Sequence, residues 1–246
     1  MDTLLADLAA LYTAALAGTS AALPALPACF ADHVTAERAL TPHEAAKGHW
    51  RGVTAEPATR LLRDRVRPDD HRAAVVVRPL RRSGEFREAC RRLDLTPFMG
   101  LAAHVARWLA HATGTDEARF GTIEAGRVSP AFEPVVGFFA NTVPLRVPVD
   151  DHLDWCTHAR RVRDLLLESS RHTLPLARIV EVAPQAHGDA GATDFDVVLV
   201  LQNPPRAPAP GPKLRVSPIR VPPASAKFPL TLFVELDETG DFTFEA

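Results

Sequence analysis

The chain has 246 residues, of which 46% are hydrophobic and 24% charged, and it carries a formal net charge of −2. These values are typical of a globular protein with one large domain or two small ones, and they argue against a disordered or fibrous chain. The near-neutral charge also argues against a bulk polyelectrolyte such as nucleic acid as the partner.

The cysteines and the N-terminal residues indicate the cellular compartment in which the protein is expected. Cys29, Cys90 and Cys156 are widely separated, which excludes a CxxC pair, a zinc ribbon or a dense disulfide framework. A reducing, cytoplasmic location is therefore expected. The apolar N-terminal stretch carries Asp2 and Asp7 where a signal peptide would be basic, so we expect neither export nor a membrane span.

Helical periodicity marks two segments in the first half. Apolar residues recur at helical spacing from Leu4 to Leu16, and Gly18 is a good stop. A partly helical stretch is expected to follow, through Arg38. Thr96 as N-cap and Pro97 at the first helical position predict a helix that ends before Gly114. Its predicted buried face consists of Phe98, Leu101, Ala102, Val105, Trp108, Leu109 and Ala112.

The stretch from Arg60 to Arg92 contains eleven arginines against five acidic residues. One interpretation is nucleic-acid binding. The favoured one is a solvated face around a strand at residues 73–77 and a small helix that carries Phe86 and Cys90, because aromatic side chains do not alternate with the arginines.

The second half alternates strands and helices. We expect strands at 119–123 and 141–149, a loop at 125–134, helices at 151–170 and 176–182, and a hairpin formed by 228–236 and 242–244. The run FDVVLVL at 195–201 predicts a central strand covered on both faces. The proline-rich stretch after it predicts a surface loop or edge crossing. The alternation favours an α/β fold with a mixed sheet.

Common catalytic and metal motifs do not occur in the sequence. His104 and His111 are too far apart for the chelate of a zinc protease, and the sequence has no HExxH, GxSxG or P-loop. His152 and His158 have acidic neighbours but are expected to be solvent-facing or structural. The residues therefore predict no metal site and no catalytic residue.

The most informative segment is Val136–Arg146, which reads VGFFANTVPLR. Taken alone, it indicates a tight apolar turn that delivers a polar side chain to a sheet edge. Core packing and a channel wall are both compatible with that arrangement.

GFFANTVPLR resembles the (I/V)GxFVNTxxxR motif of the condensation domains of nonribosomal peptide synthetases, members of the chloramphenicol-acetyltransferase-like acyltransferase superfamily. As in that family, a strand, a Gly126-Arg127 pair and a proline-containing loop precede it. Four further segments resemble the family in the expected order: LLADLAALYTAALAGTSAALPALP with Phe30-Ala31-Asp32, TPFMGLAAHVARWLAHATG, FDVVLVLQN and AKFPLTLFVEL.

The resemblance implies the fold of one C-terminal lobe of a two-lobe condensation domain, an α/β lobe with a mixed sheet and flanking helices. Residues 1–40 would form the inter-lobe helix and crossing, and residues 41–246 the lobe. It also implies a place at the floor of a substrate tunnel for Gly126, Arg127, Gly137, Phe138, Asn141 and Thr142. In the family, an acceptor amine attacks a donor thioester while carrier-protein phosphopantetheine arms hold both; no directly bound cofactor is expected.

Departures from the family are also clear. The HHxxxDG motif, whose second histidine positions or deprotonates the amine, does not occur, and the resemblance begins just after its expected place. The tryptophan of YxDYAxW is Ala36, HQDVPFE appears as residues 171–177, and the RDxSRNPL arginine and asparagine fall on Gly191 and Ala192. His172 is a disfavoured substitute base, because nothing in the sequence suggests that it faces the tunnel.

Three hypotheses remain. The first is half of a condensation domain of secondary metabolism, inactive alone, whose other lobe is a separate polypeptide, a neighbouring reading frame or a part lost to a wrong start codon; it would bind that lobe or self-associate. The second is a non-catalytic platform for a carrier protein or a tailoring enzyme, with carrier contacts at Arg81, Arg82, Arg91 and Arg92. An acyl-CoA acyltransferase ranks last, because its HxxxD motif is missing too.

Overall fold

A computed structural model describes residues 2–55, 61, 73–183, 195–202, 219, 221, 223–236 and 242–245. Contacts divide the chain into two compact units. The helix–loop unit comprises Met1–Thr41, Ala125–Ala140 and Pro204–Pro222, and the sheet unit comprises Pro42–Glu124, Asn141–Asn203 and Pro223–Ala246. The division of the domain at residue 40 stays a prediction. Gly191, Ala192, part of the arginine-rich stretch and most of the proline-rich connection lie outside the described residues.

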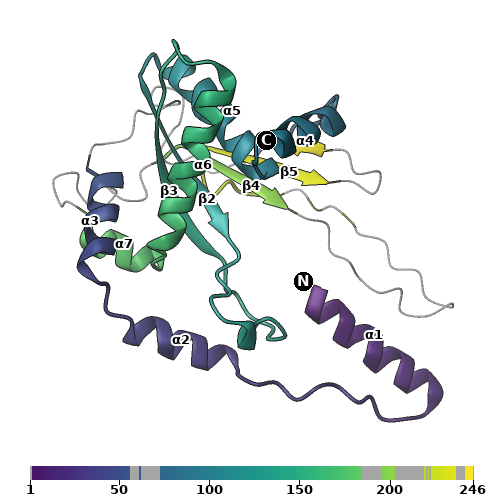
Figure 1. The fold of residues 1–246 in the computed structure, drawn as a ribbon. Helices are drawn as coiled ribbons and strands as arrows, with labels where there is room; N and C mark the ends of the chain where they lie inside the picture. Colours follow the sequence, from purple (N-terminus) through teal and green to yellow (C-terminus); the bar gives the residue numbers. More distant parts are fainter. Residues whose placement is uncertain are drawn as a thin grey trace. The chain divides into compact units, whose positions relative to one another are not determined.

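The sheet unit contains a six-stranded mixed sheet in the order β1-β6-β5-β4-β2-β3 (Figure 1). The strands are β1 Val77–Pro79, β2 Glu117–Glu124, β3 Asn141–Pro148, β4 Val197–Gln202, β5 Leu230–Leu236 and β6 Phe242–Glu245. β4 pairs in parallel with β2 and β5, whereas the other pairs are antiparallel. The mixed α/β fold predicted from the sequence is confirmed.

β4 shows why an uninterrupted apolar run forms this strand. Val197 and Leu199 lie in the main core, while Val198 and Val200 belong to a second cluster with Phe195. Because successive side chains of a strand point to opposite faces, a strand covered on both sides has no position left for a polar residue. The predicted central strand is confirmed.

Five helices contribute side chains to the main core. They are α3 Glu44–Val53, α4 Ser83–Arg92, α5 Pro97–Thr113, α6 Trp155–Arg171 and α7 Leu176–Val182. α5 and α6 lie side by side in Figure 1 and pack against β2 and β3. α5 begins as predicted, with Thr96 Oγ1 accepting a hydrogen bond from Met99 N at 3.2 Å, and it ends at Gly114, whose φ is +68°.

The predicted buried face of α5 is partly wrong. The buried residues are mainly small, namely Gly100, Ala102, Ala103, Ala106, Leu109 and Ala110, whereas Trp108 is 44% exposed. Alanines at these positions let the helix axis approach the sheet closely, and the large indole lies outside that contact. One helix boundary also differs, because α6 starts after the N-cap Asp154 rather than at residue 151. The sequence does not predict α3.

The helix–loop unit contains α1 Asp2–Ala17, α2 Phe30–Ala39 and the 3-10 turn η1 Pro130–Phe132. α1 ends before Gly18, whose φ is +65°, as the sequence predicted. Four of its leucines, Leu4, Leu8, Leu11 and Leu16, are about half exposed or more. Within the described part of the chain, no helix has both the length and the apolar character needed to cross a membrane.

Candidate functional site

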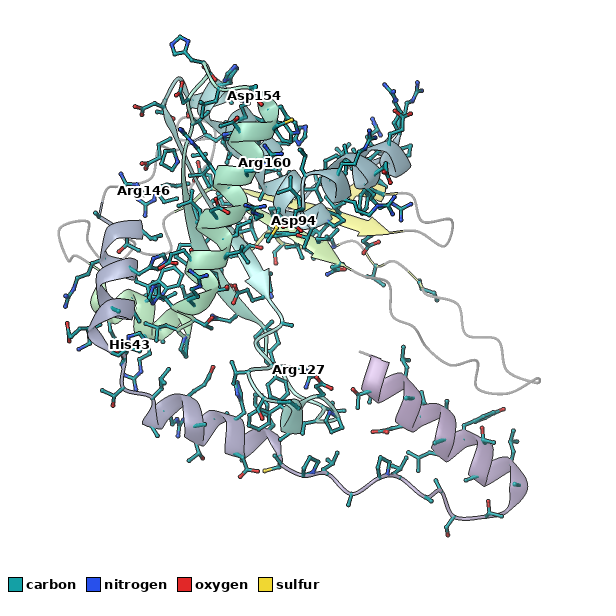
Figure 2. All side chains as sticks on the ribbon, in the orientation of Figure 1. His43, Asp94, Arg127, Arg146, Asp154 and Arg160 are labelled. Carbon is teal, nitrogen blue, oxygen red and sulfur yellow. The ribbon has the colours of Figure 1, made fainter. Side chains whose placement is uncertain are left out.

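The loop 125–140 of the helix–loop unit is organised around Arg127 (Figure 2). Its guanidinium donates hydrogen bonds to the carbonyl oxygens of Phe132 and Val135, the latter at 2.9 Å. The same group lies 4.2 Å from the centroid of the Phe139 ring, which is a favourable cation–π distance. Gly126, with φ of +64°, supplies a backbone conformation that other residues rarely adopt. Arg127 therefore holds the loop in its turn.

An aromatic cluster closes the same loop against α2. Phe30 meets Phe139 edge to face at 5.1 Å between centroids, and His33 lies 4.7 Å from Phe139. Gly137 sits against this cluster, because a methyl group there would lie 2.9 Å from Phe30 Cγ and 3.0 Å from Phe139 Cε2. The next residue, Phe138, is 80% exposed. Of the two adjacent phenylalanines in the loop, Phe139 is therefore buried and Phe138 is exposed.

Asn141 and Thr142 begin β3 in the sheet unit. Asn141 Nδ2 donates to the carbonyl of Leu174 at 2.9 Å, and its Oδ1 accepts from the backbone N–H of Leu176 at 2.9 Å. Both ends of the side-chain amide are therefore used to fix the segment that leads into α7. Thr142 is half-buried and lies opposite Ile123 of β2.

The six residues predicted to form a tunnel floor are thus divided between the two units. Gly126, Arg127, Gly137 and Phe138 belong to the helix–loop unit, whereas Asn141 and Thr142 belong to the sheet unit. Within their own units, Arg127 and Asn141 support backbone, and Phe138 is available for contact. Their place at a tunnel floor stays a prediction.

The four arginines predicted to meet a carrier protein flank or belong to α4, and all are exposed. Three have acidic neighbours on that helix: Arg82 Nε donates to Glu85 at 2.8 Å, and Arg91 and Arg92 both pair with Glu88. Arg81 has no acidic partner among the residues that the structure describes. The glutamates in these pairs partly offset the positive potential around Arg82, Arg91 and Arg92.

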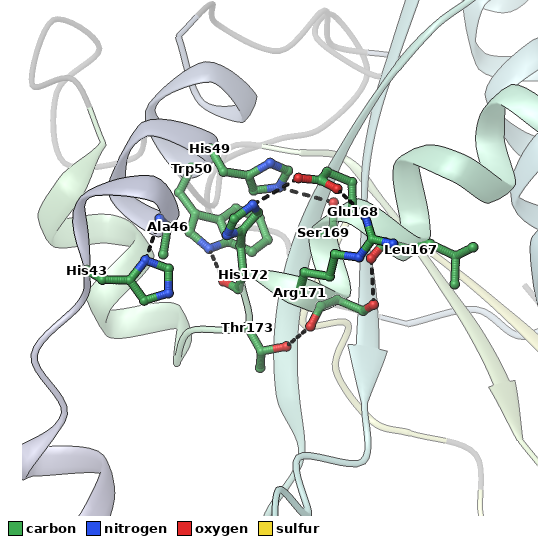
Figure 3. Close-up of polar contacts among 11 residues, drawn as sticks. His43, Ala46, His49, Trp50, Leu167, Glu168, Ser169, Arg171, His172 and Thr173 are labelled. Atoms are coloured by element: carbon green, nitrogen blue, oxygen red, sulfur yellow. Dashed lines mark hydrogen bonds and ion pairs between the residues drawn. The ribbon is translucent and has the colours of Figure 1, made fainter.

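A histidine cluster joins α3 to the end of α6 in the sheet unit (Figure 3). The His172 ring stacks on His49 at 4.9 Å between centroids, and its Nε2 lies 3.0 Å from Glu168 Oε1. His49 Nε2 lies 3.2 Å from Ser169 Oγ, and Trp50 Nε1 donates to the His172 carbonyl at 2.7 Å. The His172 imidazole therefore packs within a helix contact.

Burial lowers the pKa of His49, and the neighbouring His172 ring lowers it further, while Glu168 opposes the shift. The hydrogen bonds from His172 and Arg171 lower the pKa of the Glu168 carboxyl. This arrangement favours a neutral His49 beside an ionised Glu168. Nδ1 of His172 is buried without a hydrogen-bond partner among the described atoms.

No group of three or more His, Cys, Asp or Glu side chains in the described ranges could hold a metal ion. His158, expected to be solvent-facing or structural, is buried, with Nε2 3.1 Å from the Ala103 carbonyl. Its burial lowers its pKa, which favours the neutral ring. It serves as a structural residue of the contact between α5 and α6.

Sequence reasoning missed Glu124, the last residue of β2. It follows Ala118, Phe120 and Thr122 along the face of β2 that packs under the helices, so a carboxyl occupies the end of an otherwise largely apolar row. Burial raises the pKa of this carboxyl. A period-two reading of β2 could have found it, since it breaks the apolar row at its last position.

The family model described as "Condensation domain" matches residues 1–246, which is the whole chain. The chain belongs to the condensation-domain family. Phosphinothricin tripeptide synthetase PhsB of Streptomyces viridochromogenes is 33% identical over 97% of this chain and 21% of its own length. PhsC of the same organism is 31% identical over 80% of this chain and 19% of its own length.

Solved structures share the fold of this condensation-domain chain. SgcC5 of Streptomyces globisporus superposes with a TM-score of 0.78 and 23% identity, covering 99% of this chain and 58% of that protein. The X-domain in the complex with OxyB from teicoplanin biosynthesis gives a TM-score of 0.76 and 24% identity, over 100% and 57%. The chain therefore spans somewhat more than half of these solved structures.

Proposed function

We propose that residues 1–246 act as the C-terminal half of a condensation domain in nonribosomal peptide synthesis. In this role they supply one wall and the floor of the tunnel in which an amide bond forms between two carrier-bound thioesters. The phosphopantetheine arms of aminoacyl and peptidyl carrier proteins would enter that tunnel. The observation that carries the proposal is the family match along all 246 residues.

The proposed reaction needs a base or a positioning group for the acceptor amine, and a proton acceptor must lie within about 3 Å of the proton that it takes. HHxxxDG does not occur in residues 1–246. His172 is a poor substitute, because its ring is stacked on His49 and bonded to Glu168. We therefore propose that these residues position substrates, and that another stretch of polypeptide supplies the histidine.

A condensation assay with two loaded carrier proteins tests this division of labour. We expect the purified chain of residues 1–246 to give no amide product above the uncatalysed background. The variant His172→Ala serves as the diagnostic, since its ring would have to leave the cluster to reach a substrate. Turnover by the chain that disappears in His172→Ala would contradict the proposal.

A second candidate is a non-catalytic platform that recruits a carrier protein or a tailoring enzyme. The fold likeness to an X-domain solved in complex with OxyB favours this alternative. The exposed arginines of the α4 region, above all Arg81, offer a basic surface for an acidic partner. Charge complementarity of this kind mainly accelerates the encounter and is screened by salt.

Salt-dependent binding to a carrier protein distinguishes the platform role of the α4 region. We expect the double variant Arg81→Glu, Arg91→Glu to slow association about tenfold at low salt, because long-range steering is a rate effect. Arg51→Glu, which reverses an exposed charge on α3, is the matched control and should leave association unchanged. Equal association of all three proteins would exclude α4 as the docking surface.

A further inference from the structure

A cavity of about 320 Å³ lies in the sheet unit, where the ends of β2 and β4 meet the start of α5 and the end of α6. Its size is at the lower end of the range for small-molecule sites. Most of its lining is apolar, with contributions from Phe98, Met99, Ile123, Leu145, Leu166 and Leu201. Its described lining residues all belong to the sheet unit.

Among the lining residues that the structure describes, Glu124 is the one that carries a charge. The hydroxyls around it already have protein partners: Thr122 donates to the Leu199 carbonyl, Ser170 donates to the Leu167 carbonyl, and Ser169 lies within hydrogen-bond distance of His49. Within the described ranges, no basic side chain and no hydrogen-bond donor pairs with the Glu124 carboxyl. The cavity therefore combines an apolar wall with one unpaired acidic group.

We propose that this cavity binds a primary ammonium group carried on a short apolar stem, with the Glu124 carboxylate as its counter-ion. The stem would contact the leucine and phenylalanine side chains of the wall, and the ammonium would donate to the carboxylate. The proposal does not depend on carrier binding or on amide-bond formation.

The energetics favour a cation over a neutral ligand. The half-buried Glu124 carboxylate loses part of its hydration, and no described side chain in the cavity replaces it. The raised pKa of Glu124 expresses the same penalty, which burial causes. An ammonium would offset it through a charge-assisted hydrogen bond and its positive charge, whereas an alcohol of equal length could donate a hydrogen bond but would bring no charge to pair with the carboxylate.

Amide-resolved NMR titration of the whole chain tests the site with n-hexylammonium and with 1-hexanol, which match in stem length. We expect hexylammonium to shift the amide signals of Leu166, Ser169 and Ile123 saturably, and to bind about tenfold more tightly than hexanol. Glu124→Gln, which keeps size and removes charge, should abolish that preference. Glu133→Gln, an exposed change in the other unit, is the control and should retain it.

The pH dependence gives an independent readout. Because the ammonium pairs with the ionised carboxyl, its affinity should fall as pH drops through the pKa of Glu124, and binding should lower that pKa. Equal midpoints for the amine and the alcohol, no saturable shift with either, or an unchanged preference in Glu124→Gln would overturn the proposal. Failure of carrier binding or of condensation would leave these titrations unaffected.

Stability measurements check that the variant is folded and that the carboxyl is unpaired. A carboxyl whose folded pKa is raised favours the folded state most at low pH and loses that contribution as pH rises through the folded pKa. Glu124→Gln should therefore unfold at a slightly higher temperature than the parent chain at pH 7, and the gain should vanish below about pH 4. A less stable variant at pH 7 would mean that the carboxylate has a stabilising partner, and would overturn the proposal.

Discussion

In both the sheet unit and the helix–loop unit, a polar residue of the family motif supports the backbone. The two units differ in how much apolar surface they expose near that residue. In the sheet unit, the nitrogen and the oxygen of the Asn141 side-chain amide both form hydrogen bonds with the backbone at the start of α7. In the helix–loop unit, the Arg127 guanidinium donates hydrogen bonds to two carbonyls and lies over a phenyl ring. The sheet unit contains the main core and its motif residue Asn141 is half-buried, whereas the helix–loop unit has a small aromatic cluster and exposes Phe138.

This difference teaches that the polar residues of the motif support the backbone and that exposed apolar residues remain for other contacts. A contiguous exposed apolar surface is often an interaction site. Phe138 is exposed, as are Val128 and Val136 of the same loop, so this loop presents apolar side chains for contact within its unit. Substitutions at these residues can separate backbone support from partner contact in each unit.

Asn141→Ala should have the largest effect, because it removes two hydrogen bonds and leaves the Leu174 carbonyl and the Leu176 N–H unpaired. We expect the free energy of unfolding of the sheet unit to fall by about 2 kcal/mol. All three tryptophans, Trp50, Trp108 and Trp155, belong to this unit, so tryptophan fluorescence in urea reports it selectively. Thr142→Ala is the neighbouring control, and an equal loss there would refute the special role of Asn141.

Arg127→Ala should loosen the helix–loop unit without changing the tryptophan transition. Hydrogen exchange of the Val135 amide, which donates to the Phe132 carbonyl, is the local readout. We expect exchange to accelerate about tenfold, because the loop loses the cation that holds two carbonyls together. Arg127→Lys should recover part of the protection, since lysine keeps the charge but lacks the planar fork. Unchanged exchange in Arg127→Ala would show that the aromatic cluster alone holds the loop.

The histidine cluster should make the sheet unit sensitive to mild acid. Because the pKa of folded His49 is lowered, the unfolded chain binds more protons as pH falls through about 6.5, and stability falls with it. His49→Gln should weaken this dependence between pH 7.5 and 5.5 in urea unfolding, and the part that remains is expected from His158, whose pKa burial also lowers. His152→Gln, at an exposed site, is the control. A dependence as steep in His49→Gln as in the parent chain would contradict the role of His49.

The core elements could be predicted from the sequence because their patterns are local. β4 has an unbroken β-branched and leucine run, and α5 has Thr96 and Pro97 at its start and Gly114 at its end. α3 lacks such a pattern and contains Gly48 and Gly52. Its Trp50 is buried and donates to the His172 carbonyl, so a contact across more than a hundred residues holds the helix in place.

The family motif could also be recognised in the sequence, but the use of its residues could not. That Asn141 bonds Leu174 and Leu176 depends on where the chain after α6 returns to β3, and no spacing encodes this. Glu124 is the converse case, since a carboxyl at the end of a buried row is visible in the sequence. That no described basic side chain pairs with the Glu124 carboxyl depends on how the helices pack against β2, which the sequence does not reveal.

The rate of amide-bond formation with and without an HHxxxDG-bearing polypeptide tests the central claim most directly. Two loaded carrier proteins would be mixed with residues 1–246, with the HHxxxDG-bearing half of a condensation domain, and with both. The account predicts product only when both are present, and none when the second histidine of HHxxxDG is replaced by alanine. Product from residues 1–246 alone, or an unchanged rate after that replacement, would contradict it.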